Sequence, residues 1–109
     1  MPLFYVVLRY MSWKLNRIIS GHLSLENGEL KSEQIFEVLS ELERKLGDSP
    51  KFGGKLGVVP SASAAELLVD GVRLTLGWDI WSGVFVMAWD KKGDQLIQST
   101  IIDIFIKKP

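Results

Sequence analysis

The chain of 109 residues contains no cysteine and a single histidine, His22. The lack of cysteine excludes disulfides, thiolate metal sites and a cysteine nucleophile. Thirteen basic residues balance thirteen acidic residues, so the basic excess that is typical of nucleic-acid-binding proteins is missing. No apolar run approaches the roughly 18 residues of a membrane-spanning helix. We therefore expect neither a nucleic acid nor a membrane as the partner.

The amino-terminal stretch MPLFYVVLRYM is apolar, but no basic residue precedes its apolar run and no small-residue cleavage site follows it. It therefore predicts a first strand over residues 3–10 and not a signal peptide, which favours a cytoplasmic protein. The hydrophobic content of 47% is that of an ordinary globular protein. Length and composition together predict a single domain over residues 1–109.

The clearest helical pattern lies between residues 32 and 47. Buried-face residues recur there at spacings of four, three and four, namely Ile35, Leu39, Leu42 and Leu46. Ser32 is placed to cap a helix that begins at Glu33, and Gly47 is placed to end it.

Strand patterns occupy much of the remaining chain. The stretch RIISGHLSLENGEL, residues 17–30, alternates as a half-exposed strand would and runs into an Asn-Gly turn. Residues 72–78 also alternate, and a hairpin connection over residues 79–83 leads to a partner strand over residues 84–89. Residues 48–65 form a long connection rich in glycine and proline, in which KLGVVP or SASAAELL could supply a short strand or a turn of helix.

The last stretch, QLIQSTIIDIFIKK, fits a strand by its β-branched residues and a helix by its spacing. The helix is favoured because Asp94 is placed to cap it and because Ile97 and Ile101 lie four residues apart. The predicted fold class is therefore α+β. An antiparallel sheet of four to five strands carries one long helix and a C-terminal helix on one face, in the order ββα–ββα.

The most conspicuous candidate for a binding surface is the hairpin connection. Trp78, Asp79 and Trp81 flank its bend, and a tryptophan beside a carboxylate suits protein recognition. The alternative is that Trp78 closes the end of the core while Asp79 forms the turn by binding backbone amides. On the following strand, Val84, Val86 and Ala88 point one way and Phe85, Met87 and Trp89 the other. One row must face the core, and the second apolar row is either covered within the monomer or buried at an interface.

Two other sets of polar residues are candidates for a site. Glu33, Glu37 and Glu41 line one helix face at i, i+4 spacing, as either an acidic patch for a basic partner or a solvated face. His22 has Ser20 and Ser24 beside it on its strand, but no acid and no oxyanion motif accompanies it in the sequence. We predict a surface position for His22, with no catalytic residue, no metal site and no cofactor.

Residues 78–105, WDIWSGVFVMAWDKKGDQLIQSTIIDIF, carry a resemblance to a known group of proteins. The features that carry it are an aspartate-containing strand end, a glycine turn, a hydrophobic strand, a D…GD motif and an isoleucine-rich helix: Asp79, Gly83, 84–88, Asp90, Gly93, Asp94, Ile97 and Ile101. This pattern is similar to small immunity proteins of bacterial polymorphic-toxin and contact-dependent inhibition systems. The resemblance implies a protein that binds a cognate toxin and blocks its active site or substrate groove. Many such proteins are strongly acidic, and this chain is neutral.

The sequence therefore favours a non-enzymatic protein-binding domain, in concrete terms an immunity protein that inhibits a cognate bacterial toxin domain. One alternative is a structural domain that forms homodimers or larger homo-oligomers through its second apolar strand face. Another is a small-molecule-binding domain whose aromatic residues line a pocket. An enzyme is not favoured, because only His22 titrates near neutral pH by ordinary values.

Overall fold

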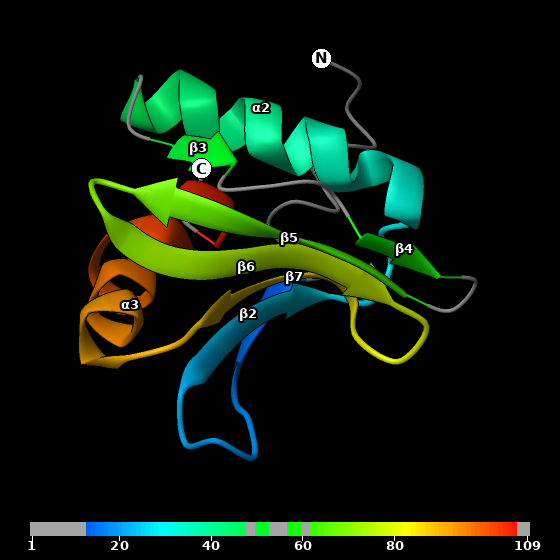
Figure 1. The fold of residues 1–109 in the computed structure, drawn as a ribbon, viewed down its shortest axis with the longest axis horizontal. Coiled ribbons are helices and arrows are strands. Elements are labelled where there is room, and N and C mark those ends of the chain that lie inside the picture. The colour runs from blue at the N-terminus through cyan, green and yellow to red at the C-terminus, as the bar shows by residue number, and fades with distance from the viewer. Residues whose placement is uncertain (1–12, 48–49, 53–56, 60–61, 107–109) are drawn as a thin grey trace.

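The computed structural model describes residues 13–47, 50–52, 57–59 and 62–106 (Figure 1). The strand predicted over residues 3–10 lies outside the described residues. The strands are β1 (Trp13–Arg17), β2 (Leu23–Asn27), β3 (Pro50–Phe52), β4 (Gly57–Val59), β5 (Ala62–Val69), β6 (Val72–Asp79) and β7 (Gly83–Ala88). The helical segments are η1 (Ser32–Gln34), α2 (Ile35–Leu46), α3 (Lys91–Leu96), η2 (Ile97–Ile101) and α4 (Ile102–Phe105).

The strands form one antiparallel sheet in the order β1-β2-β7-β6-β5-β3, and β4 also pairs with β5. Five of these strands are at least five residues long, and β3 and β4 add three residues each at the β5 side. The helices pack against this sheet, so the predicted α+β class is confirmed. The predicted ββα–ββα order gains the short strands β3 and β4 and the strand β5, which precede β6.

Two tight turns occur where the sequence patterns predicted none. The half-exposed strand predicted over residues 17–30 is interrupted by a turn at Gly21, whose φ of 89° suits glycine, and the chain reverses from β1 into β2 there. A second reversal occurs at Asp70 and Gly71, with φ of 52° and 79°, and it joins β5 to β6. An Asp-Gly pair between apolar strands is a strong hairpin signal that the sequence interpretation overlooked.

The long helix matches its prediction except at its start. Its first turn is the 3-10 segment η1, where the Gln34 side chain accepts a hydrogen bond from the Lys31 backbone N–H at 2.8 Å. Ser32 was predicted as the cap, and this is wrong, because its hydroxyl is directed to Glu33 instead. Gly47 ends the helix as predicted, with φ of 69° and its N–H bonded to the carbonyl of Glu43.

The C-terminal segment is helical, as favoured, and includes the π-helical stretch η2. Its cap is Asp90, whose side chain accepts a hydrogen bond from the Gly93 N–H at 2.8 Å. The prediction of Asp94 as the cap is therefore wrong, because the helix begins four residues earlier. None of the helices within the described ranges is long and apolar enough to cross a membrane.

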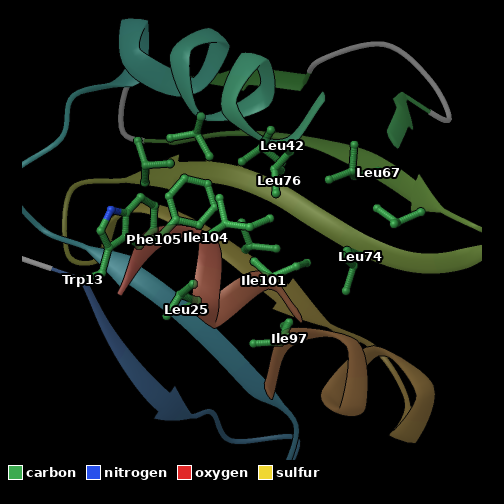
Figure 2. Packing of buried hydrophobic residues seen from close by; sticks show 14 of the residues in the cluster. Trp13, Leu25, Leu42, Leu67, Leu74, Leu76, Ile97, Ile101, Ile104 and Phe105 are labelled. Carbon is green, nitrogen blue, oxygen red and sulfur yellow. The ribbon is translucent and has the colours of Figure 1, made fainter. Parts of the chain in front are cut away.

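The core lies between one face of the sheet and the helices. Cross-strand register aligns Leu25, Val86 and Leu76 across β2, β7 and β6, and all three are fully buried. Residues from the C-terminal helix and α2 meet this row, as Figure 2 shows for Ile97, Ile101, Ile104, Phe105 and Leu42. The spacing of Ile97, Ile101 and Phe105 places all three on the inner side of the helix, which explains the pattern noted in the sequence.

Candidate functional site

The β6–β7 turn is held in one shape by Asp79. Its Oδ1 atom accepts hydrogen bonds from the backbone N–H groups of Trp81, at 2.9 Å, and Ser82. Gly83 completes the turn with φ of 72°, a left-handed conformation that favours glycine. Asp79 therefore performs the turn-forming role that was considered as the alternative to partner binding.

The side chains at the end of this turn face solvent. Trp81 is 80% exposed and Ile80 is 58% exposed. Trp78, the third residue predicted for the site together with Asp79 and Trp81, is half-buried and packs against the hydrophobic core. The hairpin thus separates the two tryptophans, and only Trp81 projects from the turn.

The other tryptophans have neighbours that hold their rings. Trp13 is buried with its ring centroid 4.6 Å from that of Phe105. Trp89 donates a hydrogen bond to the Thr75 hydroxyl at 2.7 Å, and the Arg73 guanidinium lies 4.2 Å from its ring centroid. Trp81 is the most exposed of the four, because it extends beyond the last paired residues of the hairpin.

The predicted acidic stripe is split by burial. Glu33 and Glu37 are exposed, but Glu41 is only 5% exposed and forms an ion pair with Arg44. The stripe is therefore not one continuous solvent-facing patch of three carboxylates. Glu41 is buried because it lies three residues after the buried Val38 and next to the buried Leu42, at the edge of the inward face of α2.

The fold brings the start of the long helix to the same end of the molecule as the β6–β7 turn. Gly83 lies against the end of β2, since a Cβ added to it would stand 2.0 Å from the Asn27 carbonyl oxygen and 2.6 Å from the Gly28 Cα. The chain leaves this contact through Glu29 and enters η1, which packs against β6 and β7. Figure 1 shows the cyan start of α2 and the yellow β6–β7 turn at one end.

We call this region the tip surface. It consists of exposed residues of the β6–β7 turn, the β2–η1 connection and the first turns of the helix: Ile80, Trp81, Glu29, Lys31, Glu33, Phe36 and Glu37. The two groups of residues that the sequence suggested separately thus contribute to one end of the protein, apart from the buried Glu41 and the inward-facing Trp78. Their proximity depends on the β2–β7 pairing, which no local pattern in the sequence reveals.

The second apolar row lies on the sheet face opposite the core. Phe85 and Met87 are half-buried there, and Trp89 is partly exposed beside Arg73. The Phe85 ring lies over Gly77 of the neighbouring strand, where an added Cβ would stand 2.7 Å from the ring. Cross-strand neighbours therefore cover much of this row, which lessens the apolar area that a homodimer would bury.

A carboxylate that the sequence interpretation did not connect with His22 lies beside it. The Asp94 Oδ2 atom is 2.8 Å from His22 Nδ1, and its Oδ1 accepts a hydrogen bond from the Leu23 backbone N–H at 2.8 Å. The prediction that no acid accompanies His22 is thus wrong, because the fold brings one from 72 positions away in the chain. The Ser20 hydroxyl accepts a hydrogen bond from the backbone N–H of His22 and does not contact the ring. The hydrogen bonds of Asp94 with His22 and Leu23 connect the β1–β2 turn to α3.

Burial alone would raise the pKa of Asp94. Hydrogen bonds from His22 and Leu23, together with the nearby charges of His22 and Arg17, more than offset this effect and hold the pKa below its ordinary value of 3.8. A carboxyl group with a lowered pKa stabilises the folded state above its unfolded pKa, and this contribution is lost as the pH falls through the folded pKa.

Replacing Asp94 with asparagine is therefore expected to lower the free energy of unfolding at pH 7 by about 1–2 kcal/mol, because a charged acceptor is lost. The difference between wild type and D94N should shrink as the pH is lowered below 3.8. Urea unfolding monitored by circular dichroism at neutral and acidic pH measures both effects. A difference that stays constant down to the lowest pH would contradict the role given to the carboxylate.

No group of three or more histidine, cysteine, aspartate or glutamate side chains is arranged to hold a metal ion within the described ranges. We also compared the chain with known proteins. No family model, curated protein or solved structure matches it. The candidate site therefore depends on the geometry of the tip surface.

Proposed function

We propose that this protein is a non-enzymatic protein-binding domain that uses the β6–β7 turn to contact its partner. The observation that supports the proposal is the exposure of Ile80 and Trp81 on a turn that Asp79 and Gly83 hold in one conformation. Tryptophan is among the residues that most often dominate binding energy at protein interfaces. A turn that is already ordered also loses little conformational entropy when it binds.

The partner we propose is a bacterial toxin domain that this protein inhibits in the cytoplasm. This part of the proposal rests on the resemblance of residues 78–105 to immunity proteins, which includes both Asp79 and Gly83 of the turn. The neutral net charge is compatible with it, because three exposed glutamates lie at the tip surface while the exposed Arg17, Lys91 and Lys92 lie on the β1–β2 turn side and at the start of α3. An acidic contact surface does not require an acidic protein.

The test begins with capture of the partner from the native lysate on the tagged protein, followed by affinity measurements with the purified pair. Replacing Trp81 with alanine is expected to weaken binding by about 2–4 kcal/mol, or roughly 30- to 1000-fold. The free energy of unfolding should change by less than about 0.5 kcal/mol, because the side chain is mostly exposed. Co-expression of wild type, but not W81A, should restore growth to bacteria that produce the captured partner.

Ile19→Ala provides a matched control, because Ile19 is fully exposed on the β1–β2 turn, away from the tip surface. We expect this variant to bind as wild type does. Equal affinity of W81A and wild type would contradict the proposed contact. Recovery of the protein alone, with a light-scattering mass that is a multiple of 12.3 kDa, would favour the homo-oligomer instead.

A further inference from the structure

We infer that the tip surface recognises a protein surface on which basic residues surround an apolar pocket. This inference rests on the proposed function and adds the chemistry of the partner. Ile80 and Trp81 supply the apolar part of the contact. Phe36, which is 56% exposed in the first turn of α2, adds a third large apolar side chain at this end of the molecule.

The charges around these side chains are mainly negative. Glu29, Glu33 and Glu37 are exposed, and Lys31 is the basic residue among them. In the part of the chain that the structure describes, the ion pairs join His22 to Asp94, Arg44 to Glu41 and Arg73 to Glu66, which leaves these three carboxylates outside the described pairs. They are therefore available to attract cationic groups on a partner.

Complementary charge determines which occupant fits the surface. Phosphates of a nucleic acid or of an anionic membrane would be repelled by the three carboxylates, so a cationic protein surface is favoured. A second copy of this chain could offer Arg17, Lys91 and Lys92, which lie away from the tip surface. Such head-to-tail contacts between different surfaces build rings or open chains of molecules and not the two-fold dimers that are the commonest homo-oligomers. We therefore assign the surface to a different protein.

The inference can be tested without the natural partner by nuclear magnetic resonance of the isotope-labelled protein. The probes are three synthetic peptides of equal length with the same central leucines, flanked by arginine and lysine, by glutamate or by serine. The basic peptide should shift the Trp81 indole and Ile80 methyl resonances, and binding should weaken as salt is added. The acidic and serine-flanked peptides should bind more weakly.

The charge contribution is isolated by the double variant Glu33→Gln/Glu37→Gln. We expect about 3- to 10-fold weaker binding of the basic peptide at low salt, because two exposed charges are removed. Glu43→Gln is the matched control, since Glu43 is exposed on α2 three residues before its end, and this variant should bind as wild type does.

The outcomes separate the inference from the proposed function. Equal binding of all three peptides at Trp81, or unchanged affinity of the double variant, would overturn the basic partner and leave the Trp81 contact in place. Basic-peptide binding that shifts other regions and is unaffected by W81A would overturn the inference and count against the Trp81 contact as well. Concentration-dependent shifts of the same resonances without peptide would assign the surface to a second copy of the chain, which also overturns the inference.

Discussion

Replacing Gly83 with alanine is expected to lower the free energy of unfolding by about 3–5 kcal/mol, because two penalties coincide at this position. Its φ of 72° is strained for a residue with a Cβ. The added Cβ would also stand 2.0 Å from the Asn27 carbonyl oxygen, which belongs to the backbone of a paired strand and cannot move alone. Thermal or urea unfolding measures the loss.

Two other glycines separate these penalties. Gly71 has φ of 79° with nothing within 4 Å of an added Cβ, so Gly71→Ala should show the conformational penalty alone, about 1 kcal/mol. Gly28 has open space around it and no left-handed φ, so Gly28→Ala should change stability by less than about 0.5 kcal/mol. If Gly83→Ala were no worse than Gly71→Ala, the close approach of the hairpin to β2 would be wrong.

The same contact links stability to the proposed function. Gly83 holds the β6–β7 turn against the end of β2, which leads directly into Glu29 and η1. Relief of the clash by movement of the turn would carry Ile80 and Trp81 away from the acidic residues. We therefore regard the small size of Gly83 as a requirement for assembling the tip surface, and not for the hairpin alone.

Much of the fold could be predicted because local patterns carried it. The stripe of Ile35, Leu39, Leu42 and Leu46 predicted α2, and Gly47 marked its end. The alternation of residues 84–88 predicted that one of two rows faces the core but not which one, and the structure places Val84, Val86 and Ala88 there. In the C-terminal segment, β-branched residues favoured a strand and the spacing favoured a helix. The helix forms because it buries Ile97, Ile101 and Phe105 on its inner side.

The remaining features depend on contacts between distant segments. Asp94 reaches His22 only because α3 packs beside the β1–β2 turn, and sequence spacing cannot show this. Glu41 looked equivalent to Glu33 and Glu37 at i, i+4 spacing, but it lies beside the buried Leu42 at the edge of the inward face of α2 and pairs there with Arg44. The turn at Asp70 and Gly71 is different, because its signal was present in the sequence and was overlooked.

The second large effect is expected for Phe105→Ala, which should lower the free energy of unfolding by about 3–5 kcal/mol. Phe105 is fully buried, and its ring meets that of Trp13 at a centroid distance of 4.6 Å with a tilted geometry. The substitution would leave a cavity between the end of the C-terminal helix and β1. Urea unfolding followed by the fluorescence of Trp13 and the other tryptophans measures the change.

Phe36→Ala is the matched control, because it removes the same ring from an exposed position on α2. We expect it to change stability by less than about 0.5 kcal/mol, while the affinity for a basic partner falls. The two variants should thus have opposite profiles, since Phe105 supports the core and Phe36 contributes to the tip surface. A large stability loss from Phe36→Ala with unchanged binding would mean that this ring belongs to the core and not to the contact.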